Sequence, residues 1–267
     1  MCSSKLIGAL FVLAGLAAHA QPPDVPALHA ALESGRFEEG LSLASAMIRT
    51  RPNDPGLWTA RGLALAGMNQ AQQSLASFDR ALALNPKFVP ALRAAAQTAY
   101  QQKDPRAAGY LKRLLALEPA NEAAHGMAAV TAFDRSDCQQ AVAHFALSGS
   151  RAQADPLAAS MYAQCLLRLN RASLAVDVLA ASLSAHPSRH DLRYNLAVAQ
   201  SAADQTEGAL QTLAGLDSSS AALTLIGMLR VKSGDVEGAV AALTQAIRLT
   251  PADEQPYVEL TLLCARR

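Results

Sequence analysis

The stretch SFDRALALNP, residues 77–86, has a close counterpart in ALTQAIRLTP, residues 242–251. Each segment places a bulky apolar residue three positions before an alanine. Each then continues with Leu or Ile, a second Leu and a closing proline. A pattern that returns after such a separation indicates an internal repeat, which has to be identified before any single motif is interpreted.

Three columns of residues move together along the chain in steps of 30 to 34 positions. The bulky column consists of Phe78, Leu111, Phe145, Leu179, Leu213 and Leu243. A small residue lies four positions before each of them, namely Ser74, Ala107, Ala141, Ala175, Ala209 and Ala239. A second small column precedes these by 11 or 12 positions and reads Gly62, Ala96, Ala129, Ala163, Ala197 and Gly227. Alanine is common in this chain, so the joint movement of three columns is what identifies the repeat.

Each repeat unit is predicted to be a pair of helices joined by a short turn. In the last full unit we expect helices over 221–232 and 236–249, with a turn at 233–235 and a stop at Pro251. Two helices approach within about 8 Å only where the crossing residues are small, which explains the two small columns. One such hairpin cannot bury its own apolar stripe, so successive hairpins are expected to stack into a solenoid.

Composition supports an all-α fold and argues against a polyanionic ligand. Half of the residues are hydrophobic, yet aromatic residues make up only 4%, and the excess is largely Ala and Leu, which favour helices. The 23 basic and 22 acidic residues are nearly balanced. A nucleic-acid or anionic-membrane partner would call for a basic excess, so neither is expected.

The first twenty residues are predicted to be a cleaved secretory signal peptide. Lys5 is followed by an apolar run over 6–18, and residues 18–20 read Ala-His-Ala, a small-x-small pattern that signal peptidases accept. The run is shorter than the ~20 residues of a comfortable membrane span. An uncleaved N-terminal anchor is the alternative. The mature chain is expected to have no integral membrane segment, and export to a bacterial periplasm is the favoured location.

These markers resemble the tetratricopeptide repeat (TPR) family. The resemblance is carried by Trp58, Gly62, Phe78, Ala81 and Pro86, and again by residues 194–197 and by Gly227, Gly234, Ala239, Ala246 and Pro251. It implies a right-handed α-solenoid of about six units. The expected organisation is a signal peptide over 1–20, a worn half-repeat within 21–54, the TPR array over 55–251 and a C-terminal capping helix over 252–267. A generic α-solenoid built from other helix pairs is the alternative.

The repeat departs from the family pattern at three places. The third unit is one residue short, and the fourth has Gln153 where a proline is expected. The sixth unit loses about four residues near 218–220, so the pattern is least regular around Asp217. At the end of the chain, five apolar residues are expected to shield the last hairpin: Tyr257, Val258, Leu260, Leu262 and Leu263.

The resemblance implies a non-catalytic protein that binds an unidentified protein or peptide on the concave face of the solenoid. The expected concave residues are Arg93, Gln97, Tyr100, Gln101, Phe133, Gln164, Leu167, Arg168 and Tyr194, with Val198, Met228 and Val231 completing the set. Tyr100, Phe133 and Arg168 come from consecutive first helices and are expected to contact one extended ligand together. The carboxylate clamp of chaperone-binding relatives is absent from the matching columns. The alternative function is a structural subunit of an envelope assembly or secretion complex that uses its ends and convex face.

The histidines are the candidates for binding a metal, and the cysteines are the candidates for forming a disulfide. His186 and His190 have helical metal-pair spacing, but Pro187 places them in a turn, and two imidazoles without a third ligand make a weak site. His125 and His144 are interpreted as surface or partly buried residues. Neither a metal nor a cofactor is expected. Cys138 and Cys165 are candidates for a disulfide between neighbouring units, with two separate core thiols as the alternative.

Overall fold

The computed structural model describes residues 24–265, and within that range the chain forms helices and no strands. The expected signal peptide and the last two residues lie outside the described residues. The helices are α1 (Val25–Glu33), α2 (Phe37–Thr50), α3 (Pro55–Gly67), α4 (Ala71–Leu84), α5 (Val89–Gln101), α6 (Ala107–Leu117), α7 (Glu122–Asp134), α8 (Cys138–Leu147), α9 (Arg151–Ala154), α10 (Pro156–Arg168), α11 (Ala172–Ala185), α12 (His190–Ala202), α13 (Thr206–Leu213), α14 (Ser220–Ser233), α15 (Val236–Leu249) and α16 (Gln255–Ala265). None of the described helices is long and apolar enough to cross a bilayer.

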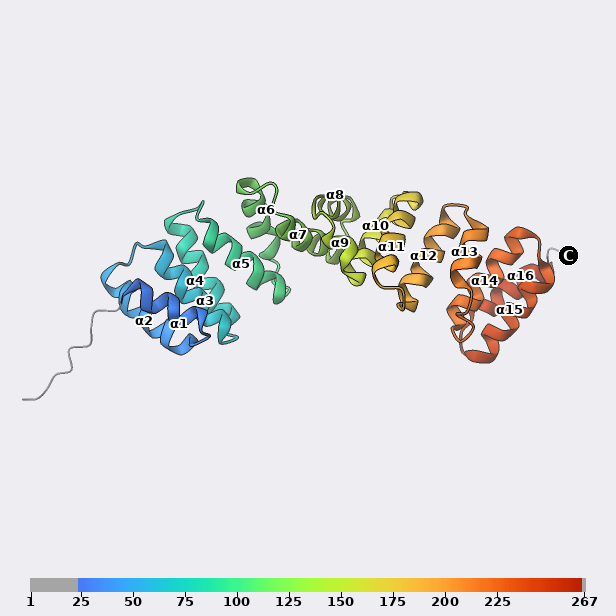
Figure 1. The fold of residues 1–267 in the computed structure, drawn as a ribbon, viewed down its shortest axis with the longest axis horizontal. Coiled ribbons are helices and arrows are strands. Elements are labelled where there is room, and N and C mark those ends of the chain that lie inside the picture. The colour runs from blue at the N-terminus through green and yellow to red at the C-terminus, as the bar shows by residue number, and fades with distance from the viewer. Residues whose placement is uncertain (1–23, 266–267) are drawn as a thin grey trace, which may run out of the picture.

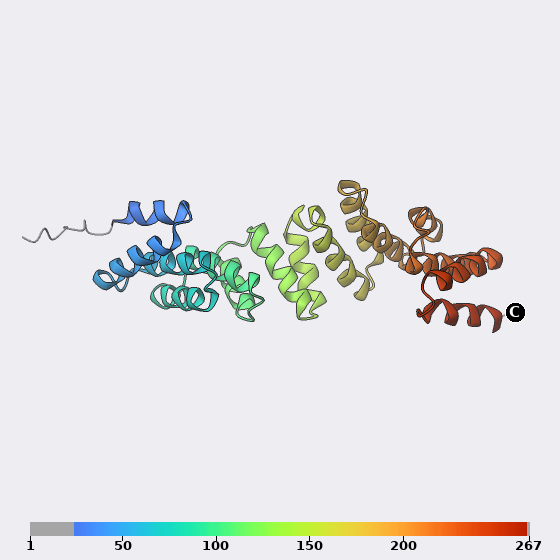
Figure 2. The ribbon, with the colours of Figure 1, turned by 90° about the horizontal axis from the view of Figure 1, so that it is seen from below.

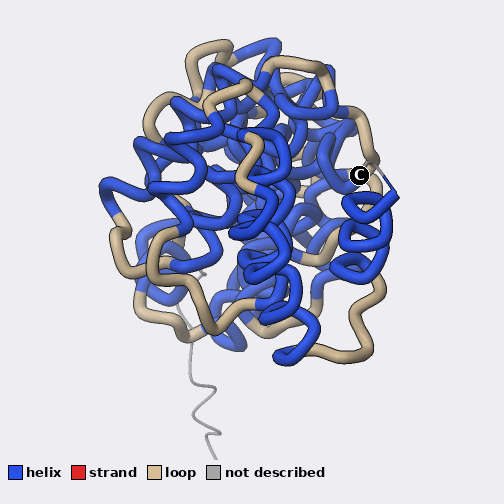
Figure 3. Tube along the Cα trace, turned by 90° about the vertical axis from the view of Figure 1, so that its right-hand side faces the viewer, coloured by secondary structure: helices blue, strands red, loops and turns tan. Residues whose placement is uncertain are grey.

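Consecutive helices pack in pairs, and the pairs follow one another along a single elongated array (Figure 1). Helices α1 and α16 lie at opposite ends of it, as the view from below also shows (Figure 2). Seen end-on, the described part of the chain consists of helices joined by loops (Figure 3). The expected all-α solenoid of paired helices is therefore confirmed. We call α3, α5, α7, α10, α12 and α14 the first helices of their units.

The three repeated columns form the contact inside each hairpin. All members of the bulky column are buried, and so are both small columns. A Cβ added to Gly62 of α3 would lie 2.3 Å from Phe78 Cε1 of α4, and one added to Gly227 would lie 2.6 Å from Leu243. The bulky side chain thus occupies the space that the small residue leaves open, as the repeat pattern predicts.

The segment expected to hold half a repeat contains a complete hairpin, α1 and α2. In this hairpin the bulky residue lies on the first helix and the small one on the second, the reverse of the other units. Leu28 stands 34 positions before Gly62, and Ala44 stands 34 positions before Phe78. Both Leu28 and Ala44 are buried. Leu32 of α1 fills the space over Gly40 of α2, where an added Cβ would lie 2.9 Å from its Cδ2 atom. The repeat pattern did not predict this hairpin, because the pattern requires a small residue in the first helix and a bulky residue in the second.

Two units are irregular where the repeat departs from the family pattern. Helix α8 has 10 residues and is followed by the four-residue α9, whose Ala152 is buried against the neighbouring helices. Helix α13 has 8 residues, and the chain then runs without a helix to Ser219. Leu216 is buried in this connection and replaces part of the missing second helix.

Helix α16 covers the preceding unit less completely than expected. Leu263 and Pro256 are buried, and Leu260 is half-buried. Tyr257, Val258 and Leu262, however, are 44%, 49% and 47% exposed. The expectation that all five apolar residues act as a shield is therefore wrong, because one helix packs through a single stripe and turns its remaining faces outward.

Candidate functional site

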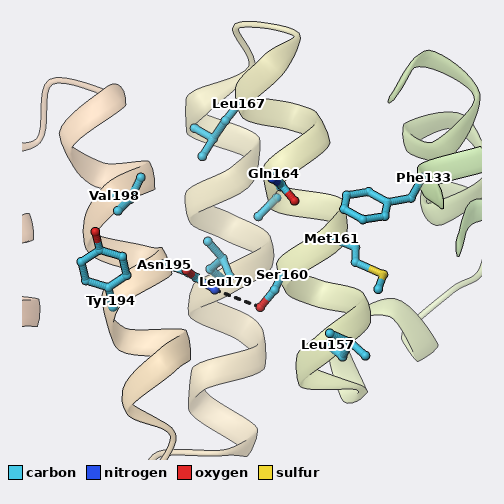
Figure 4. Close-up of a pocket in the computed structure, with 11 residues that line it drawn as sticks. Phe133, Leu157, Ser160, Met161, Gln164, Leu167, Leu179, Tyr194, Asn195 and Val198 are labelled. Atoms are coloured by element: carbon cyan, nitrogen blue, oxygen red, sulfur yellow. Dashed lines mark hydrogen bonds between the residues drawn. The ribbon is translucent and has the colours of Figure 1, made fainter. Parts of the chain in front are cut away.

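Three first helices and the second helix between two of them enclose a crevice of about 490 Å³, which we call the central crevice (Figure 4). Helices α7, α10 and α12 form its walls, and Leu179 of α11 closes its floor with no exposed surface. Its lining consists of Phe133, Leu157, Ser160, Met161, Ala163, Gln164, Leu167, Leu179, Tyr194, Asn195 and Val198. Successive hairpins bring these residues together because each unit contributes one first helix to the same side of the array.

The central crevice combines apolar walls with a small number of polar groups. Phe133 and Tyr194 lie on opposite sides of α10, with Gln164 between them (Figure 4). Asn195 Nδ2 donates a hydrogen bond to Ser160 Oγ at 3.1 Å, and that hydroxyl donates to the Pro156 carbonyl at 2.9 Å. No lysine, arginine, aspartate, glutamate or histidine contributes to the lining. Such a surface can hold uncharged side chains and pair with backbone amides.

Of the nine residues predicted for ligand binding, four line the central crevice: Phe133, Gln164, Leu167 and Tyr194. Val198, which completed the wider set, lies there too. The other five lie outside this lining. Arg93 is held by an ion pair to Glu118, with 2.8 Å between guanidinium nitrogen and carboxylate oxygen. Gln97, Gln101 and Arg168 are exposed.

Tyr100 borders a different cavity of about 730 Å³, which also contains Lys103, Asp104 and Asp134. Burial, followed by the nearby carboxylates of Asp134 and Asp155, raises the pKa of the Tyr100 hydroxyl. Tyr100, Phe133 and Arg168 therefore do not line a common cavity.

Sequence reasoning missed Leu157 and Met161 on α10 and the amide of Asn195 on α12. Leu157, Met161, Gln164 and Arg168 follow one another at helical spacing, so a single face of α10 could have been extended from Gln164 toward its N-terminus. Asn195 is placed by its hydrogen bond to Ser160, 35 residues away. The repeat period of about 34 residues puts these two positions side by side on adjacent first helices.

The groove continues past Tyr194 toward the C-terminal end. A smaller cavity of about 260 Å³ shares Tyr194 with the central crevice and adds Thr224 and Met228 of α14 and Asp253. Met228 was among the expected concave residues and is 41% exposed. The central crevice and this smaller cavity thus meet at Tyr194 and together extend over α7, α10, α12 and α14.

The structure pairs Cys138 with Cys165, whose Cα atoms are 4.9 Å apart. Cys138 begins α8, directly after the turn that follows Phe133, and Cys165 is the neighbour of Gln164 on α10. The disulfide therefore joins the α7–α8 hairpin, which forms one wall of the central crevice, to α10, which lies at its centre. Cys264 on α16 is exposed and unpaired. Within residues 24–265, no group of three or more His, Cys, Asp or Glu side chains is arranged to hold a metal ion.

Comparison with known proteins gives a family match over two segments and one curated relative over a part of the chain. Residues 55–88 and 220–253 match the family described as tetratricopeptide repeat. A stretch of 89 residues is 30% identical to the peroxisomal targeting signal receptor of Saccharomyces cerevisiae, and this match spans 32% of the present chain and 14% of the receptor. Most of the receptor therefore has no counterpart here.

Several solved structures share the architecture. The C-terminal part of a TPR repeat-containing protein from Cytophaga hutchinsonii gives a TM-score of 0.58 at 12% identity, over 87% of this chain and 98% of that one. YrrB, described as a TPR protein with an unusual peptide-binding site, gives 0.53 at 16% identity, over 82% and 97%. MamA from Desulfovibrio magneticus gives 0.53 at 18% identity, over 61% and 93%. At these identities the likeness concerns the fold alone. Tetratricopeptide repeats are found in the two matched segments, residues 55–88 and 220–253.

Proposed function

We propose that the protein is an exported, non-catalytic scaffold that binds an extended peptide or a helix of a partner protein in the central crevice. The observation that carries this proposal is the crevice itself. Three consecutive units contribute Phe133, Gln164 and Tyr194 to one continuous surface that contains no charged side chain. Its volume of about 490 Å³ is suited to a few side chains of a ligand that continues along the groove.

The chemistry of the walls favours a segment with uncharged, apolar side chains. Two aromatic rings and the aliphatic residues of α10 offer apolar contact area, while Gln164 and Asn195 supply amides for the ligand backbone. Binding energy at such surfaces concentrates in a few aromatic anchors. YrrB, which shares the fold, is described as having a peptide-binding site, and this description is consistent with the proposal.

The test begins with capture of partners from envelope extracts on the immobilised protein, followed by mass spectrometry and peptide mapping of each partner. The mapped peptide is then titrated by fluorescence anisotropy against Phe133→Ala and Tyr194→Ala. Each change should weaken binding by ~2 kcal/mol, which is roughly 30-fold, while the melting temperature stays near that of the wild type.

Tyr100→Ala is the matched control. It also removes a half-buried aromatic side chain from a first helix, but its cavity is separate from the central crevice. Tyr100→Ala should leave the affinity unchanged. Equal losses in all three variants, or no loss in Phe133→Ala and Tyr194→Ala, would contradict binding at the central crevice.

Export is part of the proposal and rests on the N-terminal sequence and on the paired cysteines. A signal peptide followed by a disulfide is typical of a chain that folds in an oxidising compartment. Expression of the full chain in a bacterium, separation of the periplasm and N-terminal sequencing should give a mature protein that begins at Gln21. Recovery of the uncleaved chain in the cytoplasm would refute export.

A second candidate function is a structural subunit that docks through its ends, and α16 supplies the observation in its favour. Tyr257, Val258 and Leu262 are exposed together on that helix. Replacing all three by Ser should abolish incorporation into an envelope complex and leave peptide binding intact. The two functions are thus distinguished by which set of variants loses the partner.

A further inference from the structure

A second crevice lies between the second helices α6 and α8, over the intervening α7. Its volume is about 480 Å³, and we call it the Lys112 crevice. Ala108 and Leu115 of α6 provide half-buried apolar side chains, and Lys112 of the same helix stands at its wall. It shares no lining residue with the central crevice. The proposed peptide site therefore does not account for it.

The charged residues that line the Lys112 crevice are both cationic, Lys112 of α6 and Arg135 directly after α7. His144 of α8 adds an imidazole ring, and no Asp or Glu belongs to the lining. Arg135 also borders the neighbouring cavity that contains Asp104 and Asp134. Among the described residues, however, neither Lys112 nor Arg135 has a carboxylate partner within 4.0 Å. These charges are therefore available to an anion that enters from solvent.

His144 is held at this wall by a buried histidine. His125 is 5% exposed, and its Nε2 atom lies 3.0 Å from the Pro119 carbonyl oxygen. Because a carbonyl only accepts, His125 Nε2 carries the proton and its Nδ1 atom is an acceptor in the neutral ring. The contact of 2.9 Å between the two Nδ1 atoms then requires His144 Nδ1 to donate. The remaining ring nitrogen of His144, Nε2, is the atom that takes up a further proton.

Protonation at this nitrogen would turn an acceptor into a donor and add a positive charge to the wall. Burial, and after it the neighbouring His125, lowers the pKa of His144. An anion bound beside the ring would stabilise the protonated form and raise that pKa. Ligand and proton would therefore bind together.

We propose that the Lys112 crevice binds a small amphipathic carboxylate, with its negative group beside Lys112 and His144 and its apolar tail on Ala108 and Leu115. The volume falls within the ~300–1,000 Å³ of small-molecule sites. The one-sided charge selects an anion, and the apolar surface selects one that carries a hydrocarbon chain. The ligand class thus differs from that of the central crevice.

Dodecanoate, kept below its micellar concentration, is the probe, and isothermal titration calorimetry on the full mature chain is the measurement. Acetate tests the carboxylate without a tail, and dodecyltrimethylammonium tests the tail with the opposite charge. Dodecanoate should bind, whereas acetate and the cationic probe should not. Lys112→Gln should weaken dodecanoate binding at least about tenfold, because a charge-assisted hydrogen bond is lost. Lys87→Gln, which removes an exposed lysine outside the crevice, should leave it unchanged.

A pH series separates the contribution of His144. Dodecanoate affinity should rise as the pH falls from about 7.5 to about 5.5, and the rise should disappear in His144→Gln. The other charged groups around the crevice, Lys112 and Arg135 in its lining and Asp134 and Asp137 in the adjoining turn, are all retained in His144→Gln, so a trend that disappears in this variant belongs to His144.

Three results would overturn the proposal: equal binding of dodecanoate and the cationic probe, equal binding of dodecanoate and acetate, or unchanged affinity in both Lys112→Gln and His144→Gln. Melting temperatures of the variants verify that they are folded. None of these results depends on whether a peptide occupies the central crevice.

Discussion

Replacing Gly62 by alanine tests whether the repeat pattern reflects close packing. An added Cβ would lie 2.3, 2.6 and 2.9 Å from three ring carbons of Phe78, which has no exposed surface and therefore little freedom to move. Overpacking of this kind typically costs about 1–3 kcal/mol. The same substitution also gains about 1 kcal/mol, because alanine favours a helix interior over glycine.

Gly109→Ala is the matched control, since the two contributions have to be separated. Gly109 is exposed in α6, and nothing lies within 4 Å of a Cβ placed there. It should therefore gain the helix preference without the clash. The free energies of unfolding of the two variants should differ by about 1–3 kcal/mol, with Gly62→Ala the less stable. For a chain of this size, each kcal/mol corresponds to about 2–4 °C in melting temperature.

The protein contains a single tryptophan, Trp58, on the same helix as Gly62. Urea unfolding can thus be followed by fluorescence for this hairpin and by circular dichroism for the whole array. Adding Phe78→Leu to Gly62→Ala recreates the Ala96 and Leu111 combination of the next unit and should recover about 1 kcal/mol or more as a coupling energy. Equal stabilities of Gly62→Ala and Gly109→Ala would refute the packing explanation of the small column.

Four further predictions address the core, the cysteines, the histidine pair and the C-terminal helix. Leu179→Ala, at a fully buried position, should lower the free energy of unfolding by about 2–5 kcal/mol in urea titrations, and a smaller loss would contradict its place in the core. Thiol labelling of the denatured, non-reduced mature chain should detect one reactive cysteine, and three reactive thiols would exclude the bond. The free energy of unfolding of the Cys138→Ser, Cys165→Ser double variant should be lower by roughly 3–4 kcal/mol, as expected for a separation of 27 residues. The pKa of His144 is lowered from 6.5 in the folded state, so the unfolded chain takes up a proton first as the pH falls. The stability of the folded chain should therefore decrease below that value. Melting temperatures at about pH 7.5 and 5.5 should show this decrease in the wild type and a smaller one in His144→Gln. Deleting residues 255–267 should expose the surface covered by Pro256 and Leu263 and lower the melting temperature, whereas an unchanged value would show that α16 does not stabilise the array.

The regular hairpins could be predicted from the sequence because their spacing is enforced by contact. In the last full unit the expected helices at 221–232 and 236–249 compare with Ser220–Ser233 and Val236–Leu249 in the structure. Gly227 and Leu243 touch, so a change in spacing would break the interlock. The short α9 could not be predicted from a period, because its buried Ala152 fits a local gap rather than a repeated column.

The candidate site was predictable only in part. The helical period specifies on which face of its helix a residue lies, but it does not specify where neighbouring side chains leave a cavity. Phe133 and Tyr100 occupy similar places near the ends of successive first helices, yet they line different cavities. The pairing of His125 with His144 could have been predicted from their positions on either side of the turn. In an antiparallel hairpin, residues equidistant from the turn meet, and these two flank the same turn as Ala129 and Ala141.

The exchanged sizes in the first hairpin set a limit on how this array can be recombined. The later units share one way of fitting, a small first helix against a bulky second one, so an added copy of such a unit would meet neighbours of the kind it already has. The pair α1–α2 fits in the opposite sense, with Leu28 and Leu32 on its first helix and Gly40 and Ala44 on its second. A hybrid of α1 with the second helix of another unit would bring bulky side chains against bulky ones, and the reverse hybrid would leave a void. The first hairpin would therefore have to be transferred as a whole, whereas the units that follow it share a fit that allows one copy to be added beside another.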